Sequence, residues 1–175
     1  MSETDGRSAQ LIELARLAAA RGDGAAAMAS LRQAVALEEE DFGGSRPEVL
    51  VALGTLEAES GALAAASGHL RGALDRQSAQ LGEDSPALAD TMIRLAAVGP
   101  ALEVLETAEE LLRRAARIVD PAGPALPALL NDLARVLVRR GDNAGAESVL
   151  VRLHEIKAAH VGSAHPEVAT IVAAL

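Results

Sequence analysis

The chain has 175 residues, a formal net charge of −9 at pH 7 and a sequence isoelectric point near 4.9, so its overall field repels phosphate backbones. Nucleic acid is therefore not expected as a partner. Cysteine is absent, which excludes disulfides and thiolate metal sites. No run is long enough to span a bilayer, and the N-terminus lacks the basic and then apolar pattern of a secretory signal. We expect a cytoplasmic protein with no membrane partner.

Half of the residues are hydrophobic, yet Phe42 is the only aromatic residue, and Ala and Leu supply most of the apolar mass. Ala and Leu are strong helix formers, whereas strands are enriched in β-branched and aromatic residues. The composition therefore predicts an all-α protein.

The first predicted hairpin joins helices over residues 6–21 and 24–40. The intervening RGD sequence, Arg21–Asp23, recurs as Arg140–Asp142, so we interpret it as a hairpin turn and not as an adhesion motif. The second helix carries apolar residues at steps of four and three, which place Ala27, Leu31 and Ala34 on one face.

The second predicted hairpin covers residues 47–60 and 62–81 and opens at Pro47, a residue favoured at the first helical position. The separation from Gly22 to Pro47 is 25 residues, and the same separation recurs from Gly61 to Pro86 and from Gly141 to Pro166. The apolar trio also recurs, which indicates an internal repeat. Its later members are Ala66, Leu70, Ala73; Ala108, Leu112, Ala115; and Ala146, Leu150, Leu153.

Two more hairpins are predicted over residues 86–98 with 101–119, and 125–140 with 143–161, followed by a helix over 166–174. The boundary inside the third hairpin is open, because Gly99-Pro100 signals a turn while the trio at Ala108 implies one about four residues later. Either choice keeps the same face buried. The final helix would lay Val172 and Leu175 on the preceding hairpin.

The first helices of the hairpins also repeat, with large apolar residues six and nine positions after each Pro. These residues are Leu53, Leu56, Met92, Leu95, Leu130 and Leu133, and Leu11 and Leu14 repeat the pattern before Gly22. A hairpin of this kind cannot cover its own apolar face and must stack on its neighbours.

The array resembles tetratricopeptide repeats, specifically the 42-residue variety of kinesin light chains and many bacterial proteins. AGPALPALLNDLARVLVRRGDNAGAESVLVRLHEIKAAHVGSAHPEVA and ETAEELLRRAARI carry most of the resemblance. It implies a right-handed superhelical solenoid of antiparallel helix hairpins in one domain, residues 1–175. The units are about 6–46, 47–85, 86–123 and 124–165, with a terminal helix over 166–175. Two departures are that Ala, Leu or Val fills the aromatic positions and that the second unit's first helix is about one turn short.

The family implies a general binding scaffold, with protein or peptide partners and no catalytic activity. In chaperone co-factors of the family, Asn and basic side chains clamp a partner's terminal carboxylate. The matching positions here hold Glu13, Thr55, Arg94 and Asp132, so that clamp is absent.

Partner-binding candidates lie on the non-core faces of the first helices, which line the concave groove in this family. They are Glu13, Arg16, Thr55, Asp90, Arg94, Asn131, Asp132, Arg135 and Arg139. Solvated faces of amphipathic helices are the alternative interpretation. The fourth unit holds the strongest patch, although pairing of Asp132 with Arg135 within the helix would explain part of it.

No catalytic, metal or cofactor site is expected. His154 and His160 are six residues apart and do not share a helix face, whereas a metalloprotease helix places its ligands four apart. His69 stands alone. The acidic segments, Glu38–Asp41 with Glu106, Glu109 and Glu110, are interpreted as solvated helix surface.

The leading functional hypothesis is therefore an adaptor that holds a partner segment along the groove. The alternative is a structural scaffold that self-assembles into a homo-oligomer through its repeat ends. Ala- and Val-rich ends such as IVAAL favour this alternative, because uncapped repeat ends expose apolar surface.

Overall fold

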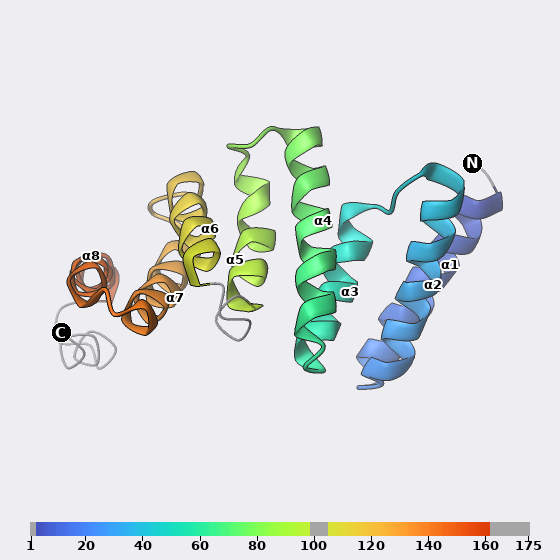
Figure 1. Cartoon of the computed structure of the whole chain (residues 1–175), viewed down its shortest axis with the longest axis horizontal. Helices are drawn as coiled ribbons and strands as arrows, with labels where there is room; N and C mark the ends of the chain where they lie inside the picture. The colour runs from blue at the N-terminus through green and yellow to red at the C-terminus, as the bar shows by residue number, and fades with distance from the viewer. Residues whose placement is uncertain (1–2, 99–104, 162–175) are drawn as a thin grey trace. The chain divides into compact units, whose positions relative to one another are not determined.

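The computed structural model describes residues 3–98 and 105–161, and it shows successive helices joined by short turns (Figure 1). The described residues form α-helices and one 3₁₀ turn, with no strand among them, which confirms the all-α prediction. The elements are α1 Glu3–Ala20, α2 Gly24–Phe42, α3 Pro47–Glu59, α4 Leu63–Leu81, η1 Pro86–Leu88, α5 Ala89–Val98, α6 Leu105–Ile118, α7 Ala125–Arg140 and α8 Asn143–Val161. None of the described helices is both long and apolar enough to cross a lipid bilayer.

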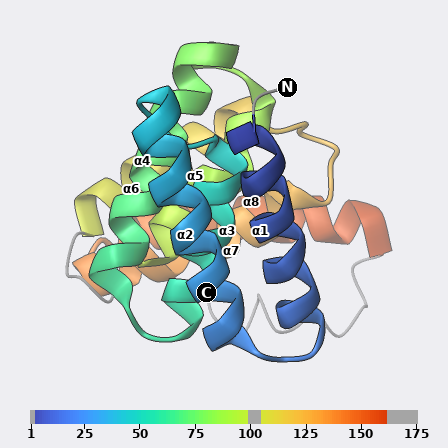
Figure 2. The same ribbon diagram turned by 90° about the vertical axis from the view of Figure 1, so that its right-hand side faces the viewer.

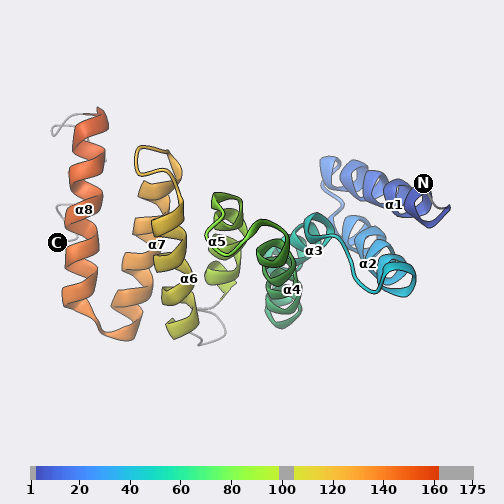
Figure 3. The ribbon, with the colours of Figure 1, turned by 90° about the horizontal axis from the view of Figure 1, so that it is seen from above.

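The chain divides into two compact units, Met1–Glu83 and Asp84–Leu175. The first contains α1–α4 and the second contains η1 and α5–α8. The division falls beside the predicted border between the second and third repeats. Within the first unit, α1 and α2 pack side by side as a hairpin (Figure 2). Within the second unit, α7 lies between α6 and α8 and packs against both (Figure 3).

The two RGD sequences form the same turn. Gly22 and Gly141 have φ angles of 77° and 82°, a left-handed conformation that glycine adopts without steric cost. The following aspartates cap the next helices: Asp23 Oδ1 accepts from the Ala26 N–H, and Asp142 Oδ1 accepts from the Gly145 N–H, both at 2.9 Å. The interpretation of RGD as a hairpin turn is confirmed.

The repeated trios form the core of the second helices. Ala27, Ala34, Ala66, Leu70, Ala73, Ala108 and Ala115 have no exposed surface, and Leu31, Leu112, Ala146 and Leu153 are also buried. Leu150 is the exception, because it is only half-buried. Alanine at these positions lets neighbouring helices approach closely, and any larger side chain there would have to displace a neighbour.

The first helices follow the pattern less uniformly. Leu53, Met92, Leu95, Leu130 and Leu133 are buried, whereas Leu56 and Leu11 are half-buried. The expectation for Leu14 is wrong: its side chain is 54% exposed, and α1 buries Ala15 and Ala18 instead. The reason is that α1 packs mainly on α2, so its buried stripe is narrower than that of a helix packed on both sides.

Most helix ends lie within two residues of the predicted ones, but α1 begins three residues early, at Glu3, and the third hairpin differs further. The helix expected over 86–98 begins as η1, where the Leu88 N–H donates to the Ser85 carbonyl at 3.1 Å and tightens the first turn. The helix expected over 101–119 is described as Leu105–Ile118, and residues 99–104 lie outside the described ranges. The expected terminal helix, with Val172 and Leu175, also lies outside them.

Candidate protein-interaction surface

One face of α7 carries Asp132, Arg135 and Arg139 at steps of three and four, so the three side chains lie along one ridge. The opposite face is apolar and buried, which fixes the orientation of the helix. The ridge borders a pocket of about 190 Å³. The pocket is lined by Ala96 and Ala97 of α5, Leu112 of α6, and Asp132, Arg135, Val136 and Arg139 of α7.

The charges on this ridge are only partly matched. Arg135 Nη2 donates to Asp132 Oδ1 at 2.5 Å, so the pairing expected as the alternative explanation does occur. Both side chains remain accessible, with the Arg135 side chain 72% exposed. Arg139 is exposed, and no carboxylate among the described residues pairs with it. The pocket therefore combines an aliphatic base with two guanidinium groups at its rim.

The other second-unit candidates do not line this pocket. Asn131 is exposed on α7 beside the ridge. On α5, Arg94 Nε donates to Asp90 Oδ2 at 2.8 Å, one helical turn away. The structure thus brings together Asp132, Arg135 and Arg139, and it leaves Asn131, Asp90 and Arg94 on surface outside the pocket.

The first-unit candidates have local roles. Arg16 donates two hydrogen bonds to the Glu13 carboxylate, at 2.9 and 2.6 Å, on an exposed part of α1. Hydrogen bonding from Arg16 lowers the pKa of Glu13. The Thr55 hydroxyl donates to the Val51 carbonyl at 2.7 Å within α3.

One pocket of the first unit has a volume of about 260 Å³ and is lined by a different set of residues. They are Ile12, Leu31, Arg46, Glu48, Val49 and Ala52. The candidates predicted from the sequence are polar residues of the first helices, so they do not include the apolar residues that form this pocket.

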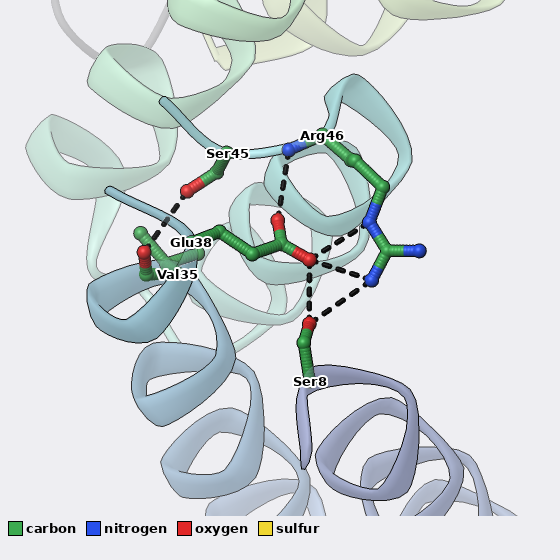
Figure 4. A network of polar contacts seen from close by, with 5 residues as sticks. All are labelled: Ser8, Val35, Glu38, Ser45 and Arg46. Atoms are coloured by element: carbon green, nitrogen blue, oxygen red, sulfur yellow. Dashed lines mark hydrogen bonds and ion pairs between the residues drawn. The ribbon is translucent and has the colours of Figure 1, made fainter. Parts of the chain in front are cut away.

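Glu38 is a buried carboxylate, and its assignment to a solvated surface is wrong. Its side chain is 2% exposed and lies among Ser8, Ser45 and Arg46 (Figure 4). Glu38 Oε1 accepts from the Ser8 hydroxyl at 2.5 Å and from Arg46 Nε and Nη2 at 2.7 and 2.6 Å, and Oε2 accepts from the Arg46 backbone N–H at 2.9 Å. Burial raises the pKa of Glu38, but these hydrogen bonds outweigh burial and hold the pKa below its ordinary value.

Glu57 is a second buried carboxylate, with 1% of its side chain exposed. Arg32 Nη2 contacts its Oε1 at 3.0 Å, and His69 Nδ1 lies 2.7 Å from its Oε2. His69 therefore does not stand alone, because Glu57 joins it to α2 and α3. Both carboxylates could have been found from the sequence: Glu38 follows Ala34, and Glu57 follows Leu53, by the step of four that continues the buried stripe.

Glu109 is also engaged, contrary to the expectation of a solvated surface. Arg113 Nε donates to it at 2.7 Å, and Arg140 Nη1 of α7 forms a further ion pair with it. Burial raises the pKa of Glu109, but the hydrogen bonds from Arg113 and Arg140 lower it overall. Glu106 and Glu110 are exposed, as expected.

The described residues contain no cluster of three or more His, Asp or Glu side chains that could hold a metal ion. His154 is half-buried, and its Nδ1 has no hydrogen-bond partner. The side chain of His160 lies outside the described part of the structure.

Neither a protein-family model nor a curated protein matches this sequence. Solved structures do match. BtubC (BKLC) from P. vanneervenii is 22% identical with a TM-score of 0.81, over 95% of this chain and 68% of that one. A kinesin light chain-like protein of Podosopora anserina, whose TPR-like repeats are nearly identical to one another, shares 24% sequence identity with this chain. Its TM-score is 0.81, and the match covers 98% of this chain and 84% of that chain. MamA is 17% identical with a TM-score of 0.70, and the match covers 90% of this chain and 75% of that chain. The chain therefore has the fold of tetratricopeptide-type repeat proteins, including those of the kinesin light chain type, as the sequence resemblance predicted.

Proposed function

We propose that this chain is a non-enzymatic scaffold that binds a protein or peptide partner along the first-helix surface of its repeats. Helical repeat arrays commonly present an extended concave surface of this kind to their partners. The pocket beside α7 carries the proposal, because an aliphatic base next to exposed arginines suits an apolar side chain with an acidic neighbour.

The size of the pocket supports a partner side chain over a small-molecule ligand. Its volume of about 190 Å³ is below the range of about 300–1,000 Å³ typical of small-molecule and cofactor sites. The buried carboxylates are already paired with arginines, which leaves neither Glu38 nor Glu57 poised as a free general base.

The test is affinity capture with the wild type and two double variants, Arg135→Ala with Arg139→Ala and Asn131→Ala with Arg135→Ala. A photoreactive residue at Ala97, an exposed position that lines the pocket, would report direct contact. The control is Arg7→Ala with Arg71→Ala, which removes the same charge from exposed sites in the first unit.

We expect to capture a partner that crosslinks to the photoreactive residue at position 97. The two α7 variants should no longer capture this partner, and the control variant should still capture it. Helicity and thermal unfolding should stay nearly unchanged in all of these variants, because surface substitutions away from the core change stability little. A partner captured equally by every variant would move the contact surface away from α7.

A second candidate is self-assembly with another copy of the chain, and a different observation favours it. Leu14 and Leu17 of α1 are 54% and 41% exposed and lie three residues apart on one face. Together they give α1 exposed apolar surface that a second copy of the chain would cover on association.

Light scattering over a concentration series tests this candidate, with Leu14→Glu and Leu17→Glu combined as the variant. Self-assembly predicts a defined oligomer for the wild type and a monomer for the variant. A wild-type monomer at every concentration would rule out this candidate while leaving the adaptor proposal intact.

A further inference from the structure

A second pocket of the second unit, lined by different residues, has a basic character. It lies between α6 and α8 and has a volume of about 270 Å³. The residues that matter are Arg113 and Arg117 of α6, Ser148 and Arg152 of α8, and Leu130 and Leu133 of α7. None of these residues belongs to the α7 ridge, so the two pockets can be tested with separate substitutions.

Helix geometry gathers the polar groups at this pocket. Arg113 and Arg117 are four residues apart on α6, and Ser148 and Arg152 are four residues apart on α8, so each pair shares one helix face. Both helices pack on α7, which contributes the buried Leu130 and Leu133. Three guanidinium groups and one hydroxyl therefore border an aliphatic base.

The positive charge here is incompletely offset. Arg113 pairs with Glu109 at 2.7 Å, and Glu109 is shared with Arg140. Arg117 and Arg152 are exposed, and no carboxylate of the described residues pairs with either. In a chain of net charge −9, an anion would be attracted by this local field and repelled by the overall one, so binding requires close contact with these groups.

The donor set fits a phosphate group better than a carboxylate. A phosphorylated side chain carries about −1.5 to −2 charges and three strong acceptor oxygens at neutral pH, whereas a carboxylate carries one charge and two oxygens. Arginine binds phosphate through two parallel N–H donors. The aliphatic base would contact the carbon atoms of the residue that carries the phosphate.

From this geometry we infer that the α6–α8 pocket binds a phosphorylated serine or threonine side chain of a partner protein. Arg117 and Arg152 donate to the phosphate, Ser148 adds a hydroxyl donor, and the half-buried Ala116 and Val149, which line the same pocket, contact the side-chain carbons. Arg113 stays paired with Glu109, and its positive charge at the edge of the pocket attracts the phosphate.

The experiment uses the whole chain labelled with ¹⁵N, and it follows the arginine Nε–Hε signals by NMR at constant ionic strength. The probes are N-acetyl-O-phosphoserine methylamide, N-acetyl-aspartate methylamide and inorganic phosphate. The variant is Arg117→Gln with Arg152→Gln, and the charge-matched control is Arg7→Gln with Arg71→Gln.

We expect the phosphoserine probe to shift the Arg117 and Arg152 signals saturably, with a Kd at least tenfold below that of the aspartate probe. The α6–α8 variant should raise this Kd at least tenfold, and the control should leave it within twofold. Circular dichroism on each protein would establish that the variants keep their helices.

Three results would overturn the inference. Equal affinity for the aspartate probe would make the pocket a general anion site. If inorganic phosphate bound as tightly as the phosphoserine probe, neither the aliphatic base nor the serine side chain that bears the phosphate would contribute to binding. An unchanged Kd in a folded Arg117→Gln, Arg152→Gln variant would place phosphoserine binding elsewhere.

Discussion

Glu38 is the most informative single residue, because it occupies a position of the apolar stripe of α2 and its carboxylate is therefore buried in the core of the first unit. The stripe of Ala27, Leu31 and Ala34 continues to Glu38 by one step of four. The buried carboxylate is tolerated because Ser8 and Arg46 together satisfy it. Glu38 therefore links α1, α2 and the start of α3 through one side chain (Figure 4).

Replacing Glu38 with glutamine should lower the free energy of unfolding at pH 7 by about 2 kcal/mol, because charge-assisted hydrogen bonds to a buried group are lost. Urea denaturation followed by circular dichroism measures this. The matched control is Glu39→Gln, the exposed neighbour, which should change stability by less than about 0.5 kcal/mol. Equal effects of the two substitutions would contradict the role given to Glu38.

The wild type and the Glu38→Gln variant should also differ in their pH dependence. The hydrogen bonds hold the folded-state pKa of Glu38 below its ordinary value of 4.5, so its contribution is present above that pH and is lost as the pH falls towards the lowered folded-state pKa. The stability difference between wild type and Glu38→Gln should therefore shrink below pH 4.5. A difference that stayed constant down to about pH 3 would argue against this linkage.

Among the helices, the contact between α3 and α4 depends on a glycine within a helix. A Cβ atom at Gly54 would lie 2.8 Å from Leu70 Cγ and 3.2 Å from the Ala66 carbonyl oxygen. At Gly68, in the middle of α4, nothing lies within 4 Å of the same atom. Close packing therefore explains Gly54, whereas nothing in the structure explains Gly68.

Alanine at these two glycines should change stability in opposite directions. Gly54→Ala should cost about 1–2 kcal/mol, because Leu70 is fully buried and cannot move away freely. Gly68→Ala should gain about 0.5–1 kcal/mol from higher helix propensity. Thermal and urea unfolding of both variants test this, and stabilisation by both would mean that α3 and α4 are not closely packed at Gly54.

The repeated alanine of the second helices makes a related prediction at α8. Ala146 is buried and Ala144 is exposed in the same turn. Ala146→Leu should destabilise the fold by about 1–3 kcal/mol through overpacking, while Ala144→Leu should be nearly neutral. Chemical denaturation measures the free energy of unfolding of both variants. An unchanged free energy for Ala146→Leu would mean that α8 packs more loosely at Ala146 than the burial of this residue indicates.

For the molecule as a whole, the net charge of −9 sets which partners can approach. We expect no binding of a labelled single-stranded oligonucleotide at about 150 mM salt, because several phosphate contacts are needed to outweigh the overall repulsion and added salt weakens each of them. Fluorescence anisotropy measures this. Saturable binding that the Arg117→Gln, Arg152→Gln variant abolished would reassign the α6–α8 pocket to a nucleic-acid backbone.

The helices, their turns and the buried trios could be predicted from the sequence, because these features depend on local propensity and on a period that repeats along the chain. The same period placed Asp132, Arg135 and Arg139 on one face of one helix. Three outcomes needed the packed structure: the partners from other helices that satisfy Glu38 and Glu57, the exposure of Leu14, and the grouping of residues from separate helices around each pocket. They depend on which helix packs against which, and a local pattern does not contain that information.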